Sequence, residues 1–500
     1  MTDEPVFTVI QPDDSVCVAL RDLAKGDTVE VNGHCVTVRE DVPFGHKVAV
    51  KTVHPGEDVL KYGYSIGAAT QKIEPGEWVH THNVKTKLEG HLTYTFQPLP
   101  KKNLKRRVPN ETFAGYVRKN GDVGIRNEIW IINTVGCINK TAEVLAKMAN
   151  ETFKGANIDG VYHFPHPYGC SQLGDDLQNT QKVLSNLVQH PNAAGVLVLG
   201  LGCENNHVDA FKRALGEYDS ESVKFLVSQE VDDELEAGMA LIEELVDYAA
   251  SFTREPVPIS ELKVGLKCGG SDGFSGITAN PLVGQYSDML VSAGGTTVLT
   301  EVPEMFGAET ILMNRAVNED VFTDIVRLID GFKDYFIKHG QEIYENPSPG
   351  NKDGGITTLE EKSLGCVQKG GTAQVAGVLG YGERVKEKGL NLVQGPGNDL
   401  VSVTALAAAG AHIVLFTTGR GTPFGGPVPT VKISTNTHLY DKKRNWIDFN
   451  AGSLIEGTRM DALSNRLFEY VTKVASGEVQ TKNEEHGFKE IAIFKDGVIL

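Results

Sequence analysis

The chain has 500 residues and a mass of 54.2 kDa, which is too long for one ordinary domain of about 100–200 residues. Hydrophobic residues make up 40% of it and charged residues 23%, so it can bury a core and is not a disordered chain. The formal net charge of −17 excludes a general nucleic-acid binder, because such proteins need a basic surface for phosphate contacts.

The N-terminus reads Met-Thr-Asp-Glu-Pro and has neither the basic nor the apolar part of a secretory signal. The least polar stretch, Val401–Thr418, contains Gly410 and His412 and predicts a helix followed by a strand, not a membrane span. Seven cysteines are an odd number for a disulfide framework. We therefore expect a cytoplasmic protein with free thiols and no membrane partner.

Residues 6–96 predict short strands separated by turns. Apolar clusters such as Phe7–Ile10 and Val16–Leu20 alternate with turn pairs such as Asn32-Gly33 and Pro75-Gly76. A basic run, Lys101–Arg107, then follows between prolines. We assign residues 1–96 to a small β domain and residues 97–112 to a solvated linker.

After residue 112, strands alternate with helices. Predicted strands are Glu128–Val135, Gly195–Leu201, Val223–Val227, Leu262–Lys267, Thr296–Glu301, His412–Thr417 and Glu490–Phe494. Helical spacing relates Leu235, Met239, Ile242, Val246 and Ala249, and also Val321, Ile325, Ile329, Phe332 and Phe336. This alternation predicts an α/β fold with parallel sheets. Two prolines within Phe252–Ser260 indicate a joint, which divides this part into a middle domain at 113–255 and a C-terminal domain at 256–500.

Two familiar signatures are incomplete. Gly200–Cys203 begins like a dinucleotide fingerprint, but Asn205 stands in place of the third glycine, which disfavours a nicotinamide site. Gly269–Gly273 matches the elbow of serine hydrolases around Ser271. That elbow needs a helix directly afterwards, and Gly276 and Pro281 argue against one.

Three cysteines follow predicted strands, at the edge where open α/β sheets place their ligands. They are Cys170, Cys203 and Cys268. Thiolates there, with His166 or a carboxylate, can bind a transition metal. The alternative is that these cysteines are small buried hydrophobic residues beside turn glycines.

Other polar motifs have two interpretations each. His80 and His82 lie on one face if they belong to a strand, where they can share a metal; otherwise they belong to a polar turn. Asn346–Lys352 predicts a loop that cannot be helical. Thr417–Pro423 presents Arg420 between glycines, which suits binding of a carboxylate or forms a structural turn.

Taken together, these motifs resemble one family, the altronate/galactarate dehydratases, along nearly the whole chain. The resemblance rests on six motifs in order: Gly121–Glu128, His166–Cys170, Gly200–Asn205, Cys268–Pro281, Pro347–Lys352 and Thr417–Pro423. Gly45–Lys47 and Tyr62–Gly67 resemble the SAF (β-clip) module of that family. Tyr168–Asp176, Leu201–Asn206 and Val302–Glu309 are most similar to its altronate branch.

The resemblance implies iron(II)- or manganese-dependent loss of water from D-altronate, which gives 2-dehydro-3-deoxy-D-gluconate in hexuronate breakdown. It also implies an N-terminal β-clip domain, a middle domain that forms a homodimer, and a C-terminal Rossmann-like domain without a nucleotide. A different sugar acid, such as galactarate, is the alternative substrate.

Dehydration of a sugar acid removes the proton next to the carboxylate, so the site has to stabilise an enediolate-like dianion, for which a divalent metal is suited. Our candidates for the general base are His46, His166 and Lys352. Arg420 is expected to hold the substrate carboxylate, with Ser271 and Asn351 as further substrate-binding residues. The predicted metal ligands are Cys170, Cys203, Cys268 and Asp272, with Glu204 in reserve.

Two other classes of function stay open at this point. A nicotinamide-dependent sugar-acid dehydrogenase agrees with the parallel-sheet pattern and is opposed by Asn205. A sugar-acid sensor without catalysis predicts thermal stabilisation by the ligand but no product.

Overall fold

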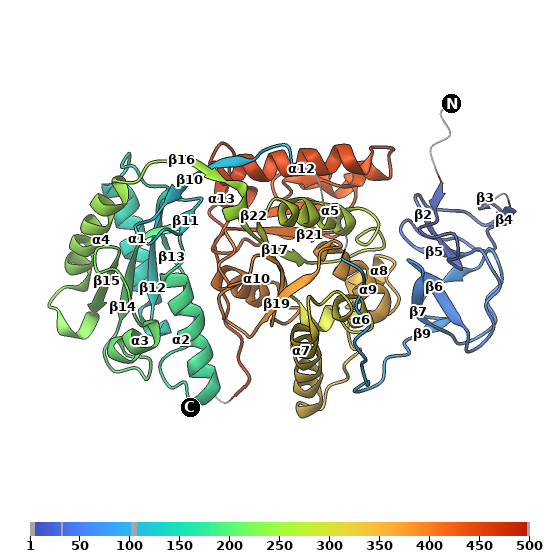
Figure 1. Cartoon of the computed structure of the whole chain (residues 1–500), viewed down its shortest axis with the longest axis horizontal. Coiled ribbons are helices and arrows are strands. Elements are labelled where there is room, and N and C mark those ends of the chain that lie inside the picture. The colour runs from blue at the N-terminus through green and yellow to red at the C-terminus, as the bar shows by residue number, and fades with distance from the viewer. Residues whose placement is uncertain (1–5, 32–33, 102–107, 498–500) are drawn as a thin grey trace.

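The computed structural model describes residues 6–31, 34–101 and 108–497. The N-terminal β domain lies at one end of the molecule, the large C-terminal domain lies in the centre, and the middle domain lies at the other end (Figure 1). The structure confirms the predicted fold class, a small β domain followed by two α/β units. The predicted turn at Asn32-Gly33 and residues 102–107 of the basic run lie outside the described residues.

The N-terminal domain consists of short antiparallel strands around a small core. Its sheets have the orders β1-β2-β5-β8, β3-β4 and β6-β7-β9. The strands are β1 (Phe7–Thr8), β2 (Val16–Ala19), β3 (Thr28–Val31), β4 (His34–Thr37), β5 (Lys47–Ala49), β6 (Asp58–Lys61), β7 (Tyr64–Ala69), β8 (Trp78–Val79) and β9 (Val84–Lys85). Cys17 and Val48 are fully buried between these sheets.

Residues 86–101 form no helix or strand and run along the C-terminal domain. The Tyr94 hydroxyl donates to Glu309 at 2.6 Å and the Leu99 amide donates to Asn314 at 2.8 Å. The next strand, β10 (Thr112–Val117), pairs with β11 (Val123–Gly124) and with β16 (Glu255–Pro258). The proline-containing joint predicted at 252–260 is thus the edge strand β16, a position that tolerates residues without an amide hydrogen.

The middle domain is a four-stranded parallel sheet with the order β13-β12-β14-β15. Its elements are β12 (Glu128–Asn133), α1 (Asn139–Thr152), β13 (Gly160–His163), α2 (Gly174–Val188), β14 (Ala193–Gly200), α3 (Val208–Leu215), β15 (Val223–Val227) and α4 (Glu234–Ala250). The apolar residues that predicted a helix at 235–249 face the sheet, because Ile242, Val246 and Ala249 are buried in α4.

The C-terminal domain is a seven-stranded parallel sheet with the order β19-β20-β18-β17-β21-β22-β23. Its strands are β17 (Lys263–Cys268), β18 (Thr296–Leu299), β19 (Val375–Leu379), β20 (Gly389–Val393), β21 (Ile413–Thr418), β22 (Thr430–Ser434) and β23 (Phe449–Asn450). Its helices are α5 (Ala279–Ser292), α6 (Glu309–Met313), α7 (Glu319–Lys338), α8 (Pro349–Asp353), α9 (Leu359–Cys366), α10 (Asp399–Ala408), α11 (Thr437–Lys442), α12 (Met460–Ala475) and α13 (Lys482–Glu485). Among the described residues, no helix combines the length and the apolar character that crossing a bilayer requires.

Two sequence predictions were wrong. Glu490–Phe494 is not a strand, because its amides donate to scattered partners, such as Thr404 Oγ1 from Ala492 and the Tyr381 hydroxyl from Phe494. Asn346–Lys352 is not wholly a loop, because α8 begins at Pro349. Proline is tolerated in the first helical turn, and Ser348 and Asn351 form a capping box there.

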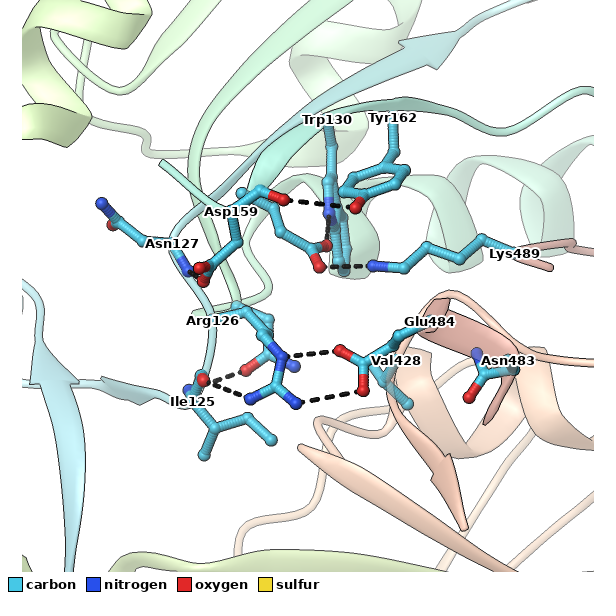
Figure 2. Close-up of polar contacts among 12 residues, drawn as sticks. Ile125, Arg126, Asn127, Trp130, Asp159, Tyr162, Val428, Asn483, Glu484 and Lys489 are labelled. Atoms are coloured by element: carbon cyan, nitrogen blue, oxygen red, sulfur yellow. Dashed lines mark hydrogen bonds and ion pairs between the residues drawn. The ribbon is translucent and has the colours of Figure 1, made fainter. Parts of the chain in front are cut away.

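The last segment of the chain fastens the middle domain to the C-terminal domain. Figure 2 shows Arg126 and Glu484 facing each other from the two domains, with hydrogen bonds of 2.6 and 3.1 Å. Lys489 pairs with Glu128, whose carboxylate also accepts from Trp130 at 2.6 Å. All these side chains are buried, so the two domains are joined by satisfied charge pairs rather than by a loose linker.

Candidate functional site

A cavity of about 540 Å³ lies at the carboxyl edge of the seven-stranded sheet. Strand order reverses here, because β18 lies on one side of β17 and β21 on the other. Ligands of open α/β sheets bind at such a switch point. Cys268 is the last residue of β17 and lines the cavity. The predicted position of Cys268 at the carboxyl edge of the sheet is confirmed.

Three potential metal ligands meet on the buried side of this cavity. The Cys268 sulfur lies 3.0 Å from Glu304 Oε2 and 3.4 Å from the Cys366 sulfur, and the Cys366 sulfur lies 3.1 Å from the same carboxylate oxygen. All three residues are buried. Of the part of the chain that the structure describes, only this group brings three ligand atoms within 4.8 Å of one another.

Buried lysines surround the group and hold its carboxylate ionised. Lys362 pairs with Glu304 at 2.8 Å. Burial alone would raise the pKa of Glu304, but Lys362, Lys267 and Lys369 lower it below its ordinary value. A hydrogen bond with Cys268, and then burial, raise the pKa of Cys366 well above its ordinary value. Without a cation the site therefore holds a carboxylate beside a protonated thiol.

Glu301, which is buried beside Cys268, has a left-handed backbone with φ of 71°. This conformation is uncommon for residues other than glycine and persists only where the surroundings enforce it. Its carboxylate pairs with Lys267 and accepts from the Cys268 amide at 2.9 Å. Glu301 thus fixes the end of β17, where Cys268 lies.

The donor atoms of this group fit a thiophilic cation. Metal ions in thiolate sites lie about 2.3 Å from sulfur and about 2.0–2.2 Å from carboxylate oxygen, which requires ligand atoms roughly 3–4 Å apart. The observed spacings are in this range. Two sulfurs and one carboxylate favour iron or zinc over manganese, which prefers oxygen ligands.

Three predicted residues lie beside this group. Ser271 donates to the Cys268 sulfur at 3.6 Å. Asn351 donates to the Ser271 carbonyl at 2.9 Å and accepts from Lys362 at 3.2 Å. Lys352 is half-buried in α8 and lines the cavity, and its side-chain nitrogen has no hydrogen-bond or ion-pair partner in the described residues.

Arg420 and Asp272 line a second cavity, of about 370 Å³, on the other side of Gly270. Arg420 is exposed, and a side chain added at Gly270 would lie 3.0 Å from its Cβ. The buried Asp272 carboxylate accepts from Thr435 at 2.8 Å and from Asn436 at 3.2 Å. Asp272 therefore holds two loops together and is not part of the Cys268 group.

His46 lies between the N-terminal domain and the C-terminal domain. Its Nε2 bonds to the Asp353 carbonyl at 3.2 Å and its Nδ1 accepts from the Trp78 indole at 3.2 Å. Burial lowers the pKa of His46. His80 is also buried there, 3.2 Å from Thr357 Oγ1, whereas His82 is exposed on the same turn. His46 and His80 hold the domains together, and the structure does not place His80 and His82 on one strand.

His166, Cys170, Cys203 and Glu204 lie in the middle domain, at the carboxyl ends of β13 and β14. Both ring nitrogens of His166 are bonded to backbone, Nε2 to the Asn133 carbonyl at 2.8 Å and Nδ1 to the Tyr168 amide at 3.2 Å. Burial lowers the pKa of His166. Neither nitrogen is free to take a proton from a substrate, so His166 positions its loop.

The loop that resembles a dinucleotide fingerprint binds its own side chain. Glu204 accepts from the amides of Leu201 at 3.0 Å and Gly202 at 2.6 Å. Those amides are the donors that a pyrophosphate would need at the start of a helix. Together with Asn205, this contact argues against a nicotinamide site.

Sequence reasoning missed Glu304, Cys366 and Lys362. Glu304 lies 36 residues after Cys268, and Cys366 lies 98 residues after Cys268, so no local spacing relates them. One signal was present: four of the cysteines follow a glycine directly, at 136–137, 169–170, 202–203 and 365–366. This recurrence marks Cys137 and Cys366, which were not singled out.

Comparison with known proteins gives consistent matches along the chain. Residues 5–87 match the family model described as altronate/galactarate dehydratase SAF domain. Residues 115–250 match D-galactarate dehydratase/altronate hydrolase, second domain, and residues 259–499 match D-galactarate/altronate dehydratase, C-terminal.

Three curated relatives extend this similarity over most of the chain. The altronate dehydratase of Bacillus subtilis (strain 168) is 55% identical over 99% of this chain and 99% of its own. The altronate dehydratase of Escherichia coli (strain K12) is 53% identical over 97% of this chain and 98% of its own. The galactarate dehydratase (L-threo-forming) of Escherichia coli (strain K12) is 33% identical over 91% of this chain and 90% of its own.

Proposed function

Because the chain belongs to the altronate/galactarate dehydratase family, we propose that it is a metal-dependent hydro-lyase that converts D-altronate into 2-dehydro-3-deoxy-D-gluconate. Family membership confirms the resemblance stated from the motifs. The observation that carries the choice of substrate is the near full-length similarity to two altronate dehydratases, at 55% and 53% identity.

The reaction removes the proton on C2, expels the hydroxyl on C3 and lets the enol become a ketone. The proton is weakly acidic because the adjacent carboxylate is already ionised, so stabilising the enediolate is the main task. A divalent cation held by Cys268, Glu304 and Cys366 would supply positive charge to that dianion. We propose iron(II) for this cation, in agreement with the sulfur donors.

We assign removal of the C2 proton and binding of the substrate to side chains around the two cavities. Lys352 takes the proton from C2, since its side-chain nitrogen has no partner among the described residues. Lys362 and Asn351 hold the cavity wall through their mutual hydrogen bond. Arg420, from the neighbouring cavity, binds the distal part of the substrate or its carboxylate through its planar guanidinium.

The experiment that tests the proposal is anaerobic incubation of the iron(II)-loaded protein with D-altronate and, separately, with galactarate, followed by assay of the 2-keto-3-deoxy acid. Product from altronate alone is expected. Product from galactarate alone would show that the substrate is that of the 33% identical relative, the galactarate dehydratase, and not D-altronate. No product from either acid, with iron bound, would refute the proposal.

We further propose that the protein is a cytoplasmic homodimer joined through the middle domain. All seven cysteines are free, which agrees with a reducing compartment. Val144 and Met148, one turn apart on α1, are exposed apolar residues of the middle domain, as expected for a surface that a second copy covers. Sedimentation measures whether the wild type is a dimer and whether Val144→Asp dissociates it. A monomeric wild type would refute the proposed dimer.

A further inference from the structure

Three exposed cysteines outside the proposed active site lie at one edge of the middle sheet. Cys137, Cys170 and Cys203 are all exposed. They follow β12, β13 and β14, which are neighbours in the order β13-β12-β14 and run parallel. The three cysteine loops therefore leave the sheet side by side at its carboxyl edge.

Backbone hydrogen bonds tie the three loops directly to one another. The Gly136 amide donates to the Tyr168 carbonyl at 2.9 Å, which joins the Cys137 loop to the Cys170 loop. The Asn205 amide donates to the Cys170 carbonyl at 2.9 Å, which joins the Cys203 loop to the same segment. The Cys137 thiol lies close enough to the thiols of Cys170 and Cys203 to interact electrostatically with both.

The glycine before each cysteine makes this approach possible. A Cβ on Gly136 would lie 2.6 Å from the His166 carbonyl oxygen, and one on Gly169 would lie 2.0 Å from the Thr134 carbonyl oxygen. A Cβ on Gly202 would lie 2.8 Å from Gln229 Oε1. A larger residue at Gly136 or Gly169 would push the neighbouring backbone away, and Gly202 has a φ of +131° that favours glycine. The Gly-Cys pairs therefore let the three thiols converge.

Buried polar groups hold the loops in place without any ligand. Thr134 donates to Glu204 at 2.6 Å, and Asn206 donates to the Thr134 carbonyl at 2.9 Å. His166 bonds to backbone through both ring nitrogens. A site supported in this way is preorganised, as binding sites need to be.

The chemistry of the set points to iron and sulfide. Cysteine is ordinarily among the most buried residue types, so three exposed thiols at one place need a functional explanation. Within the described residues only the Cys268 group has three ligand atoms within 4.8 Å, so these sulfurs are spread more widely than the ligands of one ion. Cysteine thiolates bound to different irons of a cluster are spread in that way.

We propose that Cys137, Cys170 and Cys203 bind a [4Fe–4S] cluster in which one iron has no protein ligand. The free iron corner faces solvent and is open to an oxygen donor of a small hydroxy acid. Gln229 donates to the Cys203 sulfur at 3.6 Å, and hydrogen bonds to ligand sulfurs tune such clusters. The assignment does not depend on which sugar acid the protein dehydrates.

The test uses the full chain, incubated anaerobically with iron, sulfide and a thiol reductant and then desalted. We expect about four irons and four sulfides per chain in addition to the ion at Cys268, with broad visible absorption and an electron paramagnetic resonance signal after reduction. Cys137→Ser, Cys170→Ser and Cys203→Ser are each expected to lose sulfide and the visible band. Cys35→Ser, an exposed thiol of the N-terminal domain, and Cys268→Ser are expected to keep both.

Thermal unfolding of each variant without iron shows whether its loss of the cluster comes from misfolding. Retention of sulfide by the triple variant C137S/C170S/C203S would overturn the proposal. So would a wild-type protein that binds a single zinc ion at these thiols, or forms a Cys137–Cys170 disulfide, without taking up sulfide.

Discussion

The buried carboxylate of Glu361 accepts a hydrogen bond from Lys47 at 2.9 Å, across the boundary between the N-terminal and C-terminal domains. Lys61, also of the N-terminal domain, donates to the other carboxylate oxygen at 2.7 Å. Glu361 lies in α9, the helix that also carries Lys362 and Cys366. Docking of the small domain therefore fixes the helix on which part of the proposed metal site is built.

Replacing Glu361 with alanine is expected to destabilise the protein strongly. Burial would raise the pKa of Glu361, but Lys47 and Lys61 lower it to about 2, so the carboxylate is ionised and its loss leaves two buried lysines unpaired. Breaking a buried ion pair in this way costs about 3–5 kcal/mol. Urea unfolding of the two proteins measures the difference.

The matched control is Lys87→Ala, which breaks an exposed ion pair with Asp58 inside the same small domain. Exposed pairs contribute about 0–1 kcal/mol. If Glu361→Ala and Lys87→Ala lower the free energy of unfolding equally, Glu361 does not hold the domains together.

Replacing Lys352 with methionine is expected to lower kcat by a factor of about 10²–10⁴, the usual contribution of a general base. Lys352 lines the cavity and its nitrogen has no partner among the described residues, so folding should be unchanged. Steady-state kinetics with D-altronate measures the effect, and Lys473→Met, an exposed lysine of α12, is the control. Wild-type kcat in the Lys352 variant would assign the base to another residue.

Replacing Arg420 with alanine is expected to lower kcat/KM for the sugar acid at least tenfold, because a charged hydrogen bond to a carboxylate contributes about 1.5–3 kcal/mol. Arg444→Ala is the comparison, since Arg444 is exposed, pairs with Asp441 and lies over the ring of Tyr440. Equal kinetics for the wild type and Arg420→Ala would remove Arg420 from substrate binding.

Replacing Cys366 with alanine is expected to weaken iron(II) binding by more than the roughly 10–100-fold that loss of a supporting contact costs. The high pKa of the Cys366 thiol means that the metal displaces a proton when it binds. Iron affinity of the wild type should therefore rise with pH, and this slope should decrease in the variant. Titration calorimetry in two buffers of different ionisation enthalpy counts the released protons; none released would exclude Cys366 as a ligand.

The alternation of strands and helices predicted the two parallel sheets well, because buried parallel strands are short apolar runs that are visible locally. Val223–Val227 was predicted with the bounds that the structure gives it. Glu490–Phe494 is equally apolar, but it bonds to Tyr381 and Thr404 and pairs with no strand of the described residues. Composition alone does not distinguish a paired strand from a buried extended segment.

The site was only partly predictable for a related reason. Cys268 was found because it ends a strand, where ligands gather. Glu304 lies in the turn after β18, and Cys366 ends α9. Only the folded sheet brings their side chains within 3.1 Å of each other. His46 and His166 have the residue type of a base, but the structure binds both ring nitrogens of each, which sequence does not reveal.

The buried His80 predicts how stability depends on pH. Burial, and then the charge of Lys47, lower the pKa of His80 to about 3, whereas an unfolded chain has a histidine pKa of about 6.5. Between these values the unfolded protein binds a proton that the folded protein does not. The free energy of unfolding therefore falls as the pH falls from 6.5 towards 3, by at most about 1.4 kcal/mol per pH unit for this residue.

His80→Gln removes this titration while glutamine can still reach Thr357. We expect its urea-unfolding free energy to fall less steeply than that of the wild type between pH 6.5 and 4.5, so that the two curves converge at acid pH. Other buried histidines, such as His190, titrate in both proteins and cancel in the difference. His54→Gln, at an exposed position of the same domain, should run parallel to the wild type. Parallel curves for His80→Gln as well would mean that His80 is protonated in the folded protein as readily as in the unfolded chain, and that the interface it shares with Thr357 is open to water.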